Sequence, residues 1–65
     1  MASLDQAQLS SLGDGIDDLA RRVAALAEQL DGGANSDGAN ALYEAERSLR
    51  MATRAIERAR RALPT

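Results

Sequence analysis

Two stripes of apolar residues repeat every three or four positions along this chain, and one glycine-rich break separates them. The first stripe consists of Leu9, Leu12, Ile16, Leu19, Val23, Leu26 and Leu30. The second consists of Leu42, Ala45, Leu49, Ala52, Ile56, Ala59 and Leu63. Alternating steps of three and four place such residues on one narrow side of a helix. The pattern therefore predicts an all-α fold, an antiparallel hairpin of two long helices, each with one apolar seam.

The first helix is expected over about residues 3–30. Ser3 can cap its start while Gln6 reaches back to the backbone. Gly13 and Gly15 lie inside this segment, where each glycine costs about 1 kcal/mol relative to alanine. The seam nevertheless passes through both positions without a change of phase, which predicts one continuous helix.

The connection between the helices is expected over residues 31–37. Gly32 or Gly33 can adopt the left-handed conformation that closes a helix. The second helix is expected over about residues 38–63, because Pro64 cannot continue it.

The chain length and composition favour assembly with a second chain. The 65 residues form at most one small domain, residues 1–65, which buries little surface alone. Cysteine and histidine are absent, which excludes disulfides and the usual zinc sites. Catalytic pairs of the Ser–His or Cys–His type are excluded for the same reason. We therefore expect a protein that is not an enzyme and has no catalytic, cofactor or metal site.

Membrane association is not expected from this sequence. No stretch approaches the ~20 apolar residues of a membrane span. The N-terminal residues lack the basic and apolar regions of a secretory signal, so a cytoplasmic location is expected. The net charge of −2 argues against indiscriminate binding to membranes or nucleic acids.

Residues beside the two seams suggest how two hairpins could pair. The flanking residues that recur every seven positions are Gly13, Ala20 and Ala27 in the first helix, and Glu46, Thr53 and Arg60 in the second. If two hairpins pack with their loops at opposite ends, one twofold axis passes near both Ala20 and Thr53. That axis matches Gly13 with Ala27 and Glu46 with Arg60. The hypothesis makes these six residues the close contact between two chains.

The other flank of the second helix carries small residues, namely Ala41, Ser48, Ala55 and Ala62. Under the same hypothesis they lie against the first helix of their own chain. The two helices also differ in charge, since residues 1–31 carry −4 and residues 39–63 carry +3. Opposite charge favours pairing of unlike helices. The layout resembles that of the plasmid RNA-binding regulator Rop, and the resemblance is one of architecture, implying a homodimeric four-helix bundle.

Five arginines recur every three or four positions in the second helix: Arg47, Arg50, Arg54, Arg58 and Arg61. Over roughly 20 Å of helix such a row could follow phosphates. Nearby Glu44, Glu46 and Glu57 instead suggest an ordinary solvated face with local ion pairs. Tyr43 is the only aromatic residue, so stacking partners for bases are missing. A solvated face, a protein-docking face and a nucleic-acid face all remain open.

These observations favour a small structural or regulatory module that acts through protein contact as a homodimeric antiparallel four-helix bundle. One alternative is an RNA- or DNA-binding regulator that uses the arginine face. Another is an accessory subunit whose hairpin packs on a larger protein.

Overall fold

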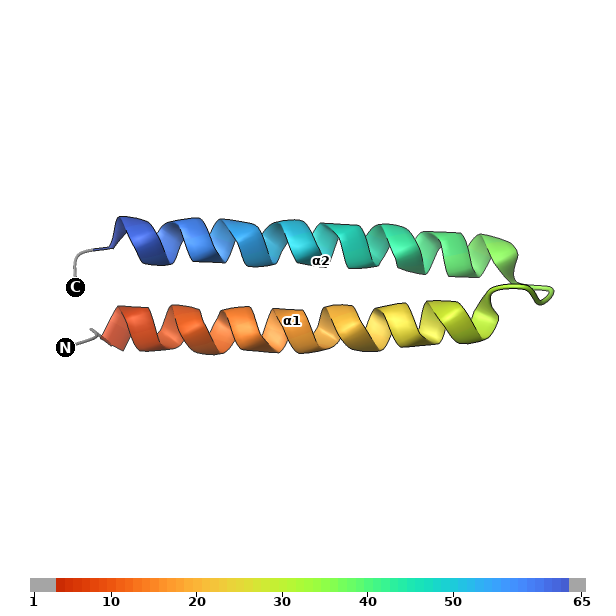
Figure 1. The fold of residues 1–65 in the computed structure, drawn as a ribbon, viewed down its shortest axis with the longest axis horizontal. Helices are drawn as coiled ribbons and strands as arrows, with labels where there is room; N and C mark the ends of the chain where they lie inside the picture. The colour runs from red at the N-terminus through yellow and green to blue at the C-terminus, as the bar shows by residue number, and fades with distance from the viewer. Residues whose placement is uncertain (1–3, 64–65) are drawn as a thin grey trace.

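The protein is an all-α hairpin of two antiparallel helices, as the seams predict. The computed structural model describes residues 4–63. Helix α1 spans Leu4–Leu30 and helix α2 spans Ser36–Ala62. The two helices lie side by side with the turn at one end and both termini at the other (Figure 1). The hairpin is long and thin, with extents of 51 × 14 × 9 Å. Ser3, the expected cap of α1, lies outside the described residues.

Helix α1 runs without interruption through both of its internal glycines, which confirms the predicted continuity. Gly13 is buried against α2, and a Cβ atom added there would lie 3.5 Å from Cγ2 of Ile56. Gly15 faces open space, since no atom would lie within 4 Å of an added Cβ. An alanine at position 13 would thus make an ordinary van der Waals contact with α2.

The turn begins with a left-handed glycine, as expected for the end of α1. Gly32 has a φ of +83°, the one positive φ among the described residues. The backbone N–H of Gly33 donates to the carbonyl oxygen of Leu30 at 3.3 Å, and that of Asp31 donates to Ala27 at 2.9 Å. These bonds satisfy carbonyl groups that the last turn of a helix leaves free.

Replacing Gly32 with alanine is expected to lower the free energy of unfolding by about 1 kcal/mol, because a Cβ atom disfavours the left-handed conformation. Gly33→Ala is the matched control, since its Cβ would make an ordinary 3.6 Å contact with the carbonyl oxygen of Leu30. We expect the control to match or slightly exceed wild type in urea unfolding. Equal losses in both variants would contradict this account of the turn.

Helix α2 begins two residues earlier than the sequence suggested. Asn35 is the N-cap, and its carbonyl oxygen accepts the backbone N–H of Ala39 at 2.9 Å. The connection is therefore shorter than the expected residues 31–37. At the other end, Leu63 is extended, with φ −80° and ψ 141°. This is the conformation that a residue preceding proline prefers, so the sequence ends the helix as predicted.

The contact between α1 and α2 is made by the column of residues that recurs every seven positions beside each seam. In α1 the buried residues are Gln6, Gly13, Ala20 and Ala27. In α2 the buried residue is Ala39, and the next members of its column are Glu46, Thr53 and Arg60, which are half-buried. Small side chains at the centre of α1 allow the two backbones to approach closely.

This arrangement corrects the expected contact between chains. Ala20 and Ala27 are fully buried within a single hairpin, so they cannot also form a close contact with a second copy. Gly13 is covered by Ile56 of the same chain. The prediction that these small residues mark an intermolecular twofold axis is therefore wrong.

The register of the two helices follows from one long-range hydrogen bond. Nε2 of Gln6 donates to the carbonyl oxygen of Arg60 at 2.8 Å. Stepping seven residues along each helix then brings Gly13 level with Thr53, Ala20 with Glu46, and Ala27 with Ala39. Each small residue of α1 thus faces a position of α2 in the same chain. Glu46 and Arg60, expected to pair with each other across two chains, bind Arg50 and Glu57 instead.

Candidate functional site

The apolar seams of both helices lie on the same side of the hairpin. On the opposite side, Nη1 of Arg50 donates to Oδ1 of Asp17 at 2.6 Å, and Tyr43 lies near Asp31. Each of these four residues comes directly after a seam residue in the sequence. The side of α1 that carries Asp17 and Asp31 therefore lies next to the side of α2 that carries Tyr43 and Arg50. The seams lie on the other side of the contact between the helices, so both seams belong to the same face of the hairpin.

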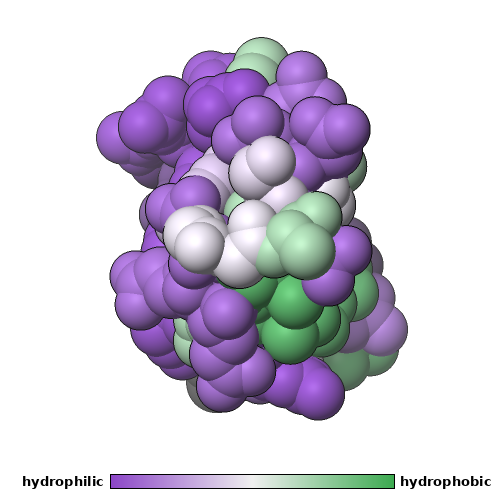
Figure 2. Space-filling view, turned by 90° about the vertical axis from the view of Figure 1, so that its right-hand side faces the viewer, coloured by the Kyte–Doolittle hydropathy of each residue, from purple (hydrophilic) through white to green (hydrophobic). Residues whose placement is uncertain are grey.

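We call this surface the apolar face. Its members are Leu9, Leu12, Ile16, Leu19, Val23, Leu26 and Leu30 of α1 and Leu42, Ala45, Leu49, Ala52, Ile56, Ala59 and Leu63 of α2. Viewed from the turn end, hydrophobic side chains gather on one side of the hairpin, over the lower helix α1 (Figure 2). The opposite flank in this view is mostly hydrophilic.

Large side chains on the apolar face remain open to solvent. Leu12, Leu19 and Leu26 are 56%, 46% and 48% exposed. They recur every seven residues and form a straight row along α1, which we call the leucine row. The seam residues nearer the helix contact are half-buried, for example Ile16 and Leu49. The hairpin therefore presents an apolar surface that its own two helices do not cover.

The matching positions of α2 carry small side chains. Ala45, Ala52 and Ala59 occupy the places that the leucine row occupies on α1. The next column outward is Ala41, Ser48, Ala55 and Ala62, all of which are exposed. We call these seven residues the alanine strip. The prediction that this outer column packs against α1 of the same chain is wrong, because the helices pair through the opposite flank.

The other surface of the hairpin, the polar face, is held by a network of charges. Asp17 accepts hydrogen bonds from both Arg21 and Arg50, and Arg50 also lies 3.6 Å from Glu46. The side chains of Asp17 and Arg50 are 36% and 38% exposed. Partly exposed pairs of this kind contribute up to about 1 kcal/mol each. Arg50 thus links the two helices, whereas the sequence placed it in a possible binding row.

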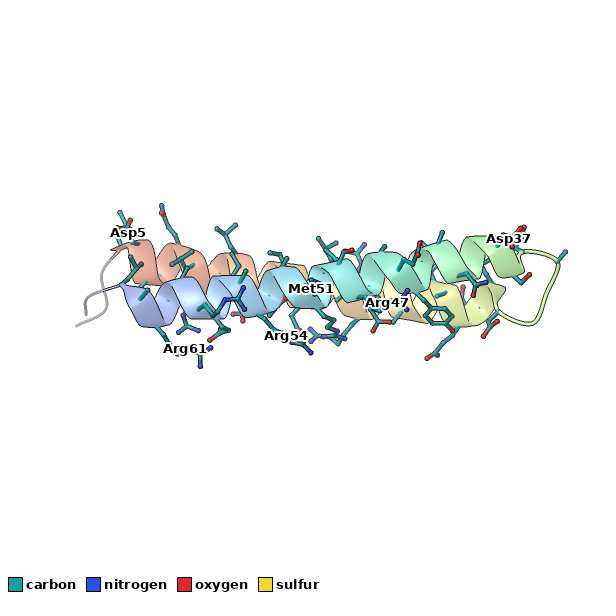
Figure 3. The ribbon with its side chains drawn as sticks, turned by 90° about the horizontal axis from the view of Figure 1, so that it is seen from above. Asp5, Asp37, Arg47, Met51, Arg54 and Arg61 are labelled. Carbon is teal, nitrogen blue, oxygen red and sulfur yellow. The ribbon has the colours of Figure 1, made fainter. Side chains whose placement is uncertain are left out.

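The other four arginines of that row project outward from α2. Arg47, Arg54, Arg58 and Arg61 are exposed, and no ion pair forms at any of them among residues 4–63. Figure 3 shows Arg54 and Arg61 along the lower edge of the view, whereas Asp37, at the start of α2, lies at the upper edge. We call these four residues the arginine row. Glu57, expected near several of them, pairs with Arg60.

Tyr43 lies where the polar face meets the turn. Its hydroxyl donates to Oδ2 of Asp31 at a long 3.4 Å. Partial burial raises the pKa of Tyr43 above its usual 10.0, and the carboxylates of Asp31 and Glu28 raise it further. Each of these influences opposes formation of a phenolate anion.

The stability of the hairpin is expected to fall above about pH 10. Because the pKa of Tyr43 is higher in the folded state, the unfolded chain ionises first as the pH rises. Folding is thus favoured below pH 10 and loses this contribution as the pH passes the folded-state pKa. Since Tyr43 is the only tyrosine, tyrosinate absorbance reports its pKa directly. Tyr43→Phe should flatten the alkaline slope in urea unfolding, and an unchanged slope would contradict the assignment.

Acidic clusters and surface depressions are the remaining candidates for a site in the described residues. No group of three or more acidic side chains within residues 4–63 could hold a metal ion. A shallow, open depression beside the start of α2 is lined by Asp37, Asn40, Ala41, Tyr43, Glu44 and Arg47. It gathers side chains of both charges. The apolar face and the arginine row are therefore the surfaces most suited to function.

Comparison with known proteins places the chain in no group. No protein-family model matches it, and neither a curated protein nor a solved structure does. Within the part of the chain that is described, neither helix is long and apolar enough to cross a membrane.

Proposed function

We propose that this protein is a non-enzymatic interaction module that works as a homodimer. Two hairpins bring their apolar faces together and form a four-helix bundle with a common core. The exposed leucine row is the observation that carries the proposal. A large contiguous apolar patch on the surface of a globular protein usually marks an interaction site.

The lack of an interior supports the same proposal. Among the described residues the buried hydrophobic side chains are Ala20, Ala27 and Ala39, and no large side chain is fully buried. Three alanines bury too little area to offset the loss of conformational entropy of two 27-residue helices. A second chain over the apolar face would convert the half-buried leucines and isoleucines into a core.

The hairpin exposes more surface than a compact monomer of its mass, and the excess is close to the area that one partner buries in a stable interface. A compact monomer of 6.9 kDa should expose about 4,000 Å². The hairpin exposes 4736 Å², an excess of about 700 Å². Each partner in a stable complex of standard size buries about 800 Å². One copy per apolar face is thus sufficient.

Sedimentation equilibrium of the intact chain tests the proposal. We expect twice the chain mass of 6.9 kDa at micromolar concentration, and a thermal midpoint that rises with concentration. A monomer that melts cooperatively at a fixed midpoint would overturn the homodimer. A monomer that is unfolded alone would instead favour an accessory subunit that folds on a larger protein.

A second candidate function is nucleic-acid binding through the arginine row. Its four side chains point away from the apolar face and would remain free in the dimer. Binding of labelled RNA or DNA duplexes should then weaken steeply with salt. It should also weaken in Arg54→Glu combined with Arg58→Glu, relative to the control Arg22→Glu on α1. No retention on either nucleic acid at low salt would exclude this function.

A further inference from the structure

Two apolar faces can meet around a twofold axis in only two ways. If the axis runs along the helices, the two turns lie at the same end and each α1 packs beside the partner's α2. If the axis crosses the helices, the turns lie at opposite ends and α1 packs beside the partner's α1. We propose that the protein assembles in the same-end arrangement, with the leucine row of each chain seated on the alanine strip of the other. This inference rests on the proposed homodimer.

The sizes of the facing side chains carry the argument. A twofold axis that runs along the helices does not change the position of any residue along that direction. The partner's α2 therefore has the same register relative to α1 as the chain's own α2. The Gln6–Arg60 register then places Leu19 within one residue, about 1.5 Å along the helix, of the partner's Ser48. One heptad away on either side, Leu12 lies equally close to the partner's Ala55, and Leu26 to the partner's Ala41. Every leucine of the row therefore meets a small side chain.

Each leucine would enter a hole of four residues, as in knobs-into-holes packing. For Leu19 these four are Ala45, Ser48, Leu49 and Ala52 of the partner. Three of the four are small, and Leu49 forms the side of the hole nearest the core. The hole therefore has room for a leucine side chain that is 46% exposed in the hairpin.

The opposite-end arrangement lacks this fit. It sets Leu19 near the partner's Leu19, and alanines of α2 against alanines of the partner's α2. Helix spacing depends on the side chains at the contact and ranges from about 8 to 10 Å. Large residues would hold the two α1 helices apart while small residues left space between the two α2 helices. A protein interior packed to native density does not tolerate such uneven filling.

The charges agree with the same choice. Helix α1 contains five acidic residues and two arginines, a net charge of −3, and α2 contains four acidic residues and six arginines, a net charge of +2. The same-end arrangement surrounds each helix with neighbours of opposite net charge. The opposite-end arrangement places like beside like, which complementary interfaces avoid.

Distance measurement between spin labels tests the orientation. The chain has no native cysteine, so Ala34→Cys places one label in the turn of each copy. The same-end arrangement predicts a separation below about 30 Å, the width of two packed helix layers and the labels. The opposite-end arrangement predicts a separation close to the 51 Å length of the hairpin.

A label at Met51→Cys serves as the matched control, because this exposed residue lies near the middle of the hairpin. It gives a short distance in either arrangement and so reports dimer formation alone. Short distances at both sites support the proposal. A short distance at Met51 with a long one at Ala34 overturns the orientation while the homodimer stands. No coupling at either site overturns the homodimer itself.

Exchange of one large and one small residue provides a second test. Ser48→Leu and Leu19→Ala should each raise the Kd of the dimer roughly tenfold, by crowding and by a cavity. Their combination should restore the Kd to within about threefold of wild type, because the two sites touch in the same-end arrangement. Effects that simply multiply would show that the sites are not in contact.

Discussion

Ala20→Leu is expected to lower the free energy of unfolding by about 1–3 kcal/mol, because the added side chain has no room between the two helices. Ala20 is fully buried and lies level with Glu46 of α2. The three added carbons must push the helices apart or force strained rotamers. In a domain of this size the thermal midpoint should fall by roughly 4–8 °C for each kcal/mol.

Ala25→Leu is the matched control for this substitution. Ala25 lies on the exposed side of the same helix, so the chemical change is identical and the packing change is absent. The control should remain within about 0.5 kcal/mol of wild type. The loss at Ala20 should persist at every protein concentration, since the crowding is inside one hairpin. Equal effects of the two variants would show that Ala20 is not packed between the helices.

The triple variant Leu12→Gln, Leu19→Gln and Leu26→Gln is expected to abolish dimer formation. Each leucine is about half exposed in the hairpin, so covering the remainder should contribute about 1 kcal/mol. A dimer contains six such residues, and their loss amounts to about 6 kcal/mol. The Kd should then rise by about four orders of magnitude. Sedimentation equilibrium over a wide concentration range measures this change.

Met51→Gln provides the comparison for the triple variant. Met51 is 65% exposed but lies on the outer side of α2, away from the apolar face (Figure 3). Removing this apolar side chain should leave the Kd unchanged. If the triple variant dimerised as tightly as the Met51 variant, the leucine row would have no part in association.

The sequence was sufficient to predict both helices because their periodicity is strong. Alternating steps of three and four place Leu9, Ile16 and Val23 on one line, and Gly32 and Pro64 mark where each helix must stop. The start of α2 was less certain, since Ser36 and Asp37 can each cap a helix. The structure instead places Asn35 at the N-cap position, where its side chain makes no capping hydrogen bond.

The side on which the helices pair could not be predicted from the same pattern. Each seam has a column of residues on either side. In α1 the small residues, such as Ala20, lie on one side of the seam, and in α2 the small residues, such as Ala55, lie on the opposite side. Either flank of α2 could therefore have faced α1. The structure places Glu46, Thr53 and Arg60 at the contact. Ala20 and Gly13 leave room beside Glu46 and Thr53, and Gln6 instead donates a hydrogen bond to the carbonyl oxygen of Arg60.

The same limit explains the polar face. Asp17 and Arg50 are 33 residues apart, and only the register of the two helices brings them within 2.6 Å. Local spacing suggested instead that Arg50 belonged with its exposed neighbours. The role of the seam residues in pairing two chains stays a prediction.

The two seams lie on a single side of the hairpin, and this limits how far association can proceed. Once a second copy has bound there, neither molecule retains an exposed apolar face that could bind a third copy. Association of this kind stops at a closed pair and cannot propagate into filaments.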